Sequence, residues 1–264
     1  MNAPDPSADP SSAPGSGPSA SGAPGTFDDG LLAAFESAQS ATIRAVRHVV
    51  AELKEGQSEV EIARALESAV RDQGFHTWFQ RPRVQLGAPA APRRWMEDRP
   101  ALREGTLVEL HLAPANQDAF GALGAAFAFG GGPDPLLLQQ ARELCRATCG
   151  FASRWKCTGE LYVYAQAWAN NRRLQLDTTE TVGHVCFPRR GRAGWLWPYG
   201  ARTAALLRRH QIQWFNHRRM HGVFHVAPRL VSGSQGLTVG ELVLIDGDRK
   251  RIIGRAGPDE VGRL

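Results

Sequence analysis

LREGTLVELHLAPANQDAFGALGAAFAFG, residues 102–130, is the stretch that decides how the chain folds. Apolar side chains alternate with others over residues 107–112, which predicts a β-strand because successive side chains of a strand point to opposite faces. A turn rich in Gly, Asn and Asp then leads into a second apolar segment at residues 125–129. The stretch therefore predicts a β-hairpin, and Glu109 and His111, two positions apart, share one face of its first strand.

Two amphipathic helices precede this hairpin. Residues 31–53 place several valine and leucine side chains on one stripe, which is typical of a helix with one buried face. A second helix is predicted from Ser58, whose hydroxyl can cap it together with Glu61 three residues later, and it continues to Gly74. Between this helix and the hairpin, short strands are expected at residues 78–79 and 84–86.

The second half of the chain repeats this order. Residues 136–156 predict a helix, and Thr158 is placed to cap another that runs toward Asn171. The segments 53–59 and 155–160 occupy matching places before their helices, which indicates a weak internal duplication. The last part predicts strands at 223–227 and 241–246 around a Gly/Ser-rich turn, preceded by a basic, Trp-containing helix over 200–219.

The composition is that of an ordinary globular protein with a polar tail. The chain has 264 residues, a net charge of +5 and 42% hydrophobic residues, enough to bury a core. Residues 1–26 are nearly all Pro, Ser, Ala, Gly and Asp, with little apolar surface to offset the entropy of ordering them. We expect a disordered tail over residues 1–26 and one folded domain over residues 27–264. Neither a signal peptide nor a membrane-spanning run is evident, so the expected location is cytoplasmic, without a membrane partner.

Arginine and cysteine usage adds little about function. Basic runs at residues 208–209 and 217–219 could contact nucleic acid or an acidic ligand. A solvated helix face explains them more simply, so a nucleic-acid partner is not expected. The cysteines lack paired CxxC spacing, and free thiols are therefore favoured over a zinc site. They are Cys145, Cys149, Cys157 and Cys186.

Four motifs, taken in order, resemble the family that contains aminopeptidase P, prolidase, methionine aminopeptidase and creatinase. They are LKEG at 53–56 with EIA at 61–63, LREGTLV at 102–108, FAFG at 127–130, and VFHVAP at 223–228 with Gly233, Gly236 and ELVLI at 241–245. The resemblance implies an α+β, pita-bread fold. In this fold two pseudo-duplicated halves, each a helical hairpin followed by β-structure, surround a curved sheet.

Family members that the chain resembles bind two divalent metal ions through two Asp, one His and two Glu. Carried onto this sequence, the Asp positions fall on His111 and Ala122, the Glu positions on Ala227 and Gly240, and the His position on His184. Two divalent cations about 4 Å apart repel strongly, so such a site needs carboxylates that bridge the ions and cancel their charge. The resemblance therefore implies that a two-metal centre is not expected here.

A different site is predicted in its place. Because residues two apart on a strand share a face, Glu109 with His111, and His225 with Ala227, are expected to line the former metal cavity, where His184 can join them. These groups could hold a single transition metal, or a Glu-oriented imidazole could act as a general base. The candidate catalytic residues are thus Glu109, His111, His184 and His225. Hydrogen-bonded pocket residues without chemistry remain the simpler interpretation.

Two further clusters are explained without a ligand. His217, His221 and His225 are spaced by four residues, but Gly222 interrupts the helix that would align them, so a metal site there, with or without His210, is not expected. The aromatic side chains of the insertion over 188–219 are typical of core packing or of a lid over a cleft. They are Trp195, Trp197, Tyr199, Trp214 and Phe215.

The favoured function is that of a degenerate member of this family, whose old cleft binds a peptide or small amidic ligand or performs repurposed chemistry. An active metallo-aminopeptidase or prolidase-type hydrolase is one alternative, in which other carboxylates would converge with His184. Those carboxylates are Asp118, Glu180, Glu241 and Asp246. An enzyme with the new mononuclear-metal or acid–base site, and a protein-interaction module, are the others. A homodimer also stays open.

Overall fold

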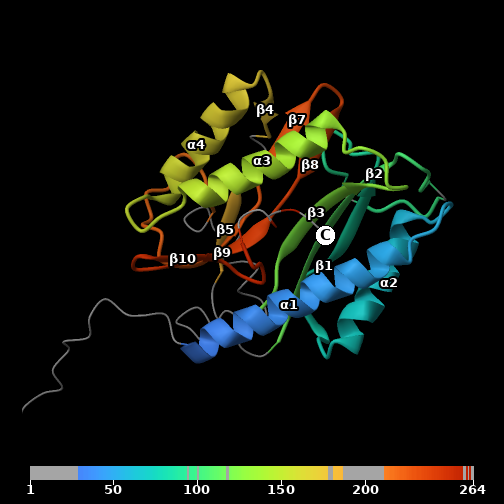
Figure 1. The fold of residues 1–264 in the computed structure, drawn as a ribbon, viewed down its shortest axis with the longest axis horizontal. Helices are drawn as coiled ribbons and strands as arrows, with labels where there is room; N and C mark the ends of the chain where they lie inside the picture. The colour runs from blue at the N-terminus through green and yellow to red at the C-terminus, as the bar shows by residue number, and fades with distance from the viewer. Residues whose placement is uncertain are drawn as a thin grey trace, which may run out of the picture.

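The computed structural model describes residues 29–93, 95–99, 101–116, 119–177, 181–186, 211–257, 260 and 262. Its helices are α1 (Asp29–Ala51), α2 (Glu59–Asp72), α3 (Leu136–Phe151) and α4 (Thr158–Asn171). Its strands are β1 (Thr77–Leu86), β2 (Leu107–Ala115), β3 (Leu123–Ala128), β4 (Gln175–Leu176), β5 (Gly183–Cys186), β6 (Gly222–Val226), β7 (Arg229–Ser232), β8 (Gln235–Thr238), β9 (Glu241–Asp246) and β10 (Arg249–Ile252). Figure 1 shows two halves, with α1 and α2 beside β1–β3 and with α3 and α4 beside the later strands.

In the first half, the helical hairpin packs on a three-stranded sheet in the order β1-β2-β3. Val46 of α1 and Leu66 of α2 share one buried core with Leu110 of β2. Removing such side chains from water is the main favourable contribution to folding. The β-hairpin predicted by residues 102–130 is present as β2 and β3, which pair antiparallel. The first half thus follows its local sequence pattern closely.

Ser58 begins α2 as the sequence predicts. Its Oγ accepts the N–H of Glu61 at 3.2 Å, and the Glu61 carboxylate accepts the N–H of Ser58 at 2.8 Å. Together the two bonds form a capping box, which satisfies N–H groups that have no partner inside the helix. The hydrogen bond from the Ser58 backbone, followed by that from its side chain, holds the pKa of Glu61 below its usual value.

Ser58→Ala is expected to lower the free energy of unfolding by about 1 kcal/mol, because alanine leaves the Glu61 N–H without its acceptor. Urea denaturation of the two proteins measures the difference. Ser58→Thr is the matched control, since threonine keeps a hydroxyl at the cap. An equal loss in both variants would show that packing around Ser58, which is buried, matters more than the cap.

β1 is a single strand rather than the two short strands predicted. Its register with β2 shifts between Trp78 and Gln80 and again between Gln80 and Arg83. Pro82 lies within the second irregularity, where it cannot donate a hydrogen bond to the ladder. The interruption in the sequence pattern therefore marks a bulge inside one strand, not a break between two.

The second half repeats the helical hairpin, followed by two sheets in the orders β10-β9-β6-β5 and β4-β7-β8. α3 packs on β6, β7, β8 and β9, and its Leu138 lies in one core with Phe224 and Leu237. A backbone bridge joins the halves, because the N–H groups of Gly124 and Gly240 donate to each other's carbonyl oxygens at 3.0 and 2.9 Å. The predicted duplication is thus present in outline.

Two predictions about the second helical hairpin are wrong. α3 ends at Phe151 rather than at residue 156, because Gly150 weakens its last turn. Thr158 does not cap α4 but is its first residue, and Cys157 occupies the N-cap position. The Thr158 hydroxyl instead donates to the carbonyl oxygen of Asn216 at 3.0 Å. The local cap lies one residue earlier than predicted, where the Glu160 carboxylate accepts the N–H of Cys157 at 2.8 Å.

The predicted basic helix is also wrong in the part that the structure describes. Residues 211–219 contain no helix. Their carbonyl oxygens instead accept hydrogen bonds from the first residues of α4, for example from the Thr158 N–H to the Arg218 carbonyl oxygen at 3.0 Å. Trp214 and Phe215 are 63% and 38% exposed, so they are not core residues. Four other members of the aromatic and histidine clusters lie outside the described residues. They are Trp195, Trp197, Tyr199 and His210.

None of the helices within the described ranges is both long enough and apolar enough to cross a membrane.

Candidate functional site

Residues from β1, β2, β5 and β6 line one cavity of about 390 Å³, which we call the histidine cavity. Glu109 and His111 reach it from β2, whereas His184 and His225 come from β5 and β6. All four candidate catalytic residues therefore lie at the same cavity, and Ala227 lies there with them. The volume is in the range of small-molecule sites.

A buried charged network holds one side of the histidine cavity. Nη1 of Arg229 donates to both carboxylate oxygens of Glu109, at 2.8 and 3.0 Å, and to Thr238 Oγ1 at 3.0 Å. Nε2 of His111 lies 2.5 Å from Glu109 Oε1. Burial disfavours the charged form of Glu109, but the hydrogen bond and charge of His111 and the charge of Arg229 outweigh it, so the pKa of Glu109 is below its usual value. Glu109 is therefore an ionised carboxylate with its charge already compensated.

His184 and His225 form the other side of the histidine cavity. They are directly opposite each other on β5 and β6, and their ring centroids are 5.2 Å apart. Burial lowers the pKa of His184 to about 4, and burial together with the charges of His184 and His111 lowers the pKa of His225 well below its ordinary value. Both rings are neutral at pH 7. Their Nε2 atoms are buried and have no hydrogen-bond partner among the described residues.

The positions that the resemblance assigns to metal-binding carboxylates carry none. His111 and Ala227 line the cavity, whereas Ala122 is buried and donates its N–H to Gln39 Oε1 at 2.8 Å. Gly240 has no room for a side chain, because a Cβ there would lie 2.6 Å from the Cβ of Ala227 and 2.8 Å from Nε2 of His225. A pair of metal ions bridged by carboxylates does not fit these residues.

Two of the other carboxylates proposed as metal ligands lie away from this cavity. Neither Glu241 nor Asp246 lines it. Glu241 accepts a hydrogen bond from Nη2 of Arg255 at 2.7 Å and is fully buried with it. Asp118 and Glu180 lie outside the described residues. Within the described ranges, no group of three or more His, Cys, Asp or Glu side chains could hold a metal ion.

His217, His221 and the four cysteines do not line the histidine cavity. His217 and His221 are exposed, and Nδ1 of His217 is 4.0 Å from the sulfur of Cys157. The four cysteines are free thiols, of which Cys157 is partly exposed and the other three are buried.

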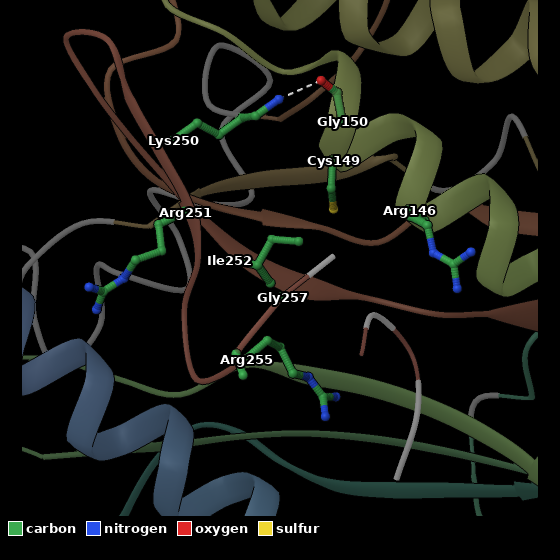
Figure 2. Close-up of a pocket in the computed structure, with 9 residues that line it drawn as sticks. Arg146, Cys149, Gly150, Lys250, Arg251, Ile252, Arg255 and Gly257 are labelled. Carbon is green, nitrogen blue, oxygen red and sulfur yellow. Dashed lines mark hydrogen bonds between the residues drawn. The ribbon is translucent and has the colours of Figure 1, made fainter. Parts of the chain in front are cut away.

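A second cavity of about 440 Å³ lies between the C-terminal end of α3 and β10 (Figure 2). Figure 2 shows Lys250 reaching over to α3, where its Nζ donates to the carbonyl oxygen of Gly150 at 2.5 Å. Arg255 lines the cavity, and its guanidinium pairs with the carboxylate of Glu241 at 2.7 Å. None of the candidate catalytic residues lines this second cavity, and the histidine cavity is therefore the stronger candidate.

The sequence matches the model of metallopeptidase family M24 over residues 33–188, more than half of the chain. The chain belongs to this family. The match includes both helical hairpins, β2 and its Glu109 and His111, and His184 on β5. The family prediction is therefore confirmed. No curated protein matches the M24 chain in sequence.

Solved structures share the fold of this M24 chain at low identity. The X-Pro aminopeptidase from Thermotoga maritima is 16% identical with a TM-score of 0.72, over 88% of this chain and 63% of that one. The prolidase from Pyrococcus furiosus is 16% identical with a TM-score of 0.67, over 88% and 66%. The methionine aminopeptidase from Thermotoga maritima is 13% identical with a TM-score of 0.68, over 87% and 98%. These comparisons confirm the predicted α+β, pita-bread fold, and the chain spans less than two thirds of the first two proteins.

Sequence reasoning missed two arginines, of which Arg83 lines the histidine cavity and Arg229 is buried behind Glu109. Arg229 is a lone charged residue between Pro228 and the apolar Leu230, and a charged residue in such a position is rarely buried without a partner. Arg83 lies opposite His111 in the register of β1 and β2 and lines the cavity. The bulge in β1 hid its position, because the alternation of side chains is lost there.

Proposed function

We propose that this M24 protein lacks a two-metal centre and uses the histidine cavity to bind a peptide or small amidic ligand. The observation that carries the proposal is Gly240, where a Cβ would lie 2.8 Å from Nε2 of His225. An imidazole and the methyl group of Ala227 occupy the space through which a carboxylate would approach a metal pair. Glu109 is the one carboxylate that lines the cavity among the residues that the structure describes, and Arg229 compensates its charge.

Apart from the charged Arg83, the lining also carries neutral groups that suit an amide. Neutral His184 and His225 each offer an unused Nε2, which can donate or accept according to tautomer. Gln80 and Gln213 add carboxamide side chains to the lining. Neutral donors and acceptors of this kind pair with peptide N–H and C=O groups without an added desolvated charge.

Metal content and peptidase activity test the first part of the proposal. The purified full-length protein, incubated separately with manganese, cobalt or zinc and then desalted, is expected to retain fewer than two equivalents of metal and to leave Xaa-Pro and N-terminal Met peptides uncleaved. The methionine aminopeptidase from Thermotoga maritima serves as the positive control. Two retained equivalents, or peptide turnover abolished by a chelator, would overturn the proposal.

Acid–base chemistry by His111 is a second candidate, favoured by its 2.5 Å contact with Glu109. An ionised carboxylate can only accept, so Nε2 of His111 carries a proton toward Glu109, and Nδ1 is the ring nitrogen left to exchange a proton with a ligand. Arg229 fixes Glu109, and Glu109 in turn orients the ring. This arrangement can move a proton to or from a bound ligand without a metal ion.

His111→Ala and His225→Ala are each expected to weaken ligand binding while changing the free energy of unfolding by no more than about 1–2 kcal/mol. The physical reason is that both rings line the cavity. Ligand-observed NMR with a panel of dipeptides and N-acetyl amino acid amides measures binding, and urea denaturation measures stability. His217→Ala, at an exposed position, is the control and should change neither. If all three variants bind the ligands as tightly as the wild type does, His111 and His225 do not contribute to the binding site.

A further inference from the structure

Arg83 carries the one charge at the histidine cavity that the described residues do not compensate. It pairs in register with His111, so the two side chains point to the same face of the sheet and both line the cavity. The guanidinium donates through Nη2 to the backbone carbonyl oxygen of Arg93. No carboxylate within the described ranges forms an ion pair with Arg83.

The other charges around the cavity are balanced. Glu109 is shared between Arg229 and His111, at 2.8 and 2.5 Å. Arg229 also lies 3.7 Å from the carboxylate of Asp177. The two facing imidazoles, His184 and His225, are neutral because burial lowers their pKa values. Among the described residues, an anionic group that enters the cavity therefore meets one uncompensated cation, Arg83, and no uncompensated carboxylate.

We propose that Arg83 binds the carboxylate of a small monocarboxylate ligand, whose neutral end faces the imidazoles of His184 and His225. The inference rests on the proposed function of the histidine cavity and adds the charge of its ligand. A guanidinium presents a planar fork of N–H donors that matches a carboxylate. One arginine compensates one negative charge, whereas a phosphate dianion would bring a second charge close to Glu109.

Matched probes test the charge requirement on the full-length protein. N-acetylglycine, N-acetylalanine and N-acetylproline are compared with their primary amides by isothermal titration calorimetry. At least one carboxylate is expected to bind about tenfold or more tightly than its amide, the ratio that a charge-assisted hydrogen bond supports. Binding of the amides at equal affinity, or binding of none of the carboxylates, would overturn the inference. Inorganic phosphate is the third arm, and binding as tight as that of the best carboxylate would show a general anion site instead.

Variants then assign the effect to Arg83. Arg83→Gln is expected to reduce the ratio of carboxylate to amide affinity to about one, and Arg83→Lys to keep part of it, because lysine retains the charge but not the fork. Arg81→Gln removes a charge from the same strand at an exposed position, paired with Glu67, and should leave the ratio unchanged. A ratio that survives in Arg83→Gln would overturn the assignment.

The outcomes separate this inference from the proposed function. Carboxylate binding that depends on Arg83, in a protein that also retains two metal equivalents, would support the inference and overturn the proposed function. Amide ligands that bind through His111 and His225, without any preference for carboxylates, would support the proposed function and overturn the inference about Arg83.

Discussion

Arg229→Met is expected to lower the free energy of unfolding by about 3–5 kcal/mol, the cost of leaving a buried charge without its partner. The substitution removes the guanidinium that donates to both oxygens of Glu109 and that lies 3.7 Å from Asp177. Methionine fills much of the space but offers neither charge nor N–H. Urea denaturation at pH 7 measures the loss.

The pH dependence of this loss gives a further check. The pKa of Glu109 is lowered in the folded protein, so its interactions stabilise the fold above the pKa of an unfolded glutamate and are lost as the pH falls through the folded value. In Arg229→Met the folded pKa of Glu109 should rise. The difference between variant and wild type should therefore be largest at neutral pH and shrink in acid.

Two controls separate the buried pair from a general effect of removing arginine. Arg71 pairs with Glu67 at 3.3 Å, but its side chain is 53% exposed, and Arg71→Met should cost less than about 1 kcal/mol. Adding Glu109→Gln to Arg229→Met should recover part of the loss, because no orphaned carboxylate remains at residue 109. Equal costs for Arg229→Met and Arg71→Met would contradict the role of the buried pair.

Gly183→Ala is expected to cost about 3–5 kcal/mol, at the upper end for a single substitution. Gly183 has a φ of +138°, and a Cβ there would lie 1.9 Å from the carbonyl oxygen of His225. The clash is with backbone, so it can be relieved only by separating β5 from β6. Because His184 follows directly and is opposite His225, the variant should also shift the NMR resonances of both imidazoles.

Gly74→Ala is the matched control for backbone strain. Gly74 has a φ of +86°, but nothing lies within 4 Å of its Cβ position. Its substitution should cost only about 1–2 kcal/mol, the penalty of a left-handed conformation, and leave both imidazoles unchanged. If Gly183→Ala costs no more than Gly74→Ala, the contact with the His225 carbonyl oxygen does not constrain the site.

The sequence determined the parts of this protein that depend on near neighbours. The capping box of Ser58 and Glu61 joins residues three apart, and the shared face of Glu109 and His111 follows from the period of a strand. The helical hairpins and the hairpin of β2 and β3 could be predicted for the same reason. The order of the motifs then indicated the family, which the match over residues 33–188 confirmed.

Predictions made from neighbouring residues were wrong where a segment distant in the sequence binds the same backbone groups. Thr158 has the chemistry of a helix cap, yet its hydroxyl bonds to Asn216, 58 residues away. The sequence predicted a helix that includes residues 211–219, but the carbonyl oxygens of Asn216 and Arg218 accept hydrogen bonds from the first two residues of α4. A hydrogen bond to a fixed tertiary partner can replace a local one at little net cost, so propensity does not decide these positions.

The candidate site was decided by tertiary structure. The sequence could nominate His184 and His225, but only the register of β5 with β6 places the two rings 5.2 Å apart. Arg229 reaches Glu109 across 120 residues of sequence, and the bridge between Gly124 and Gly240 joins the two halves. Charge compensation and the space left for a side chain are properties of such long-range contacts, which no window of neighbouring residues contains.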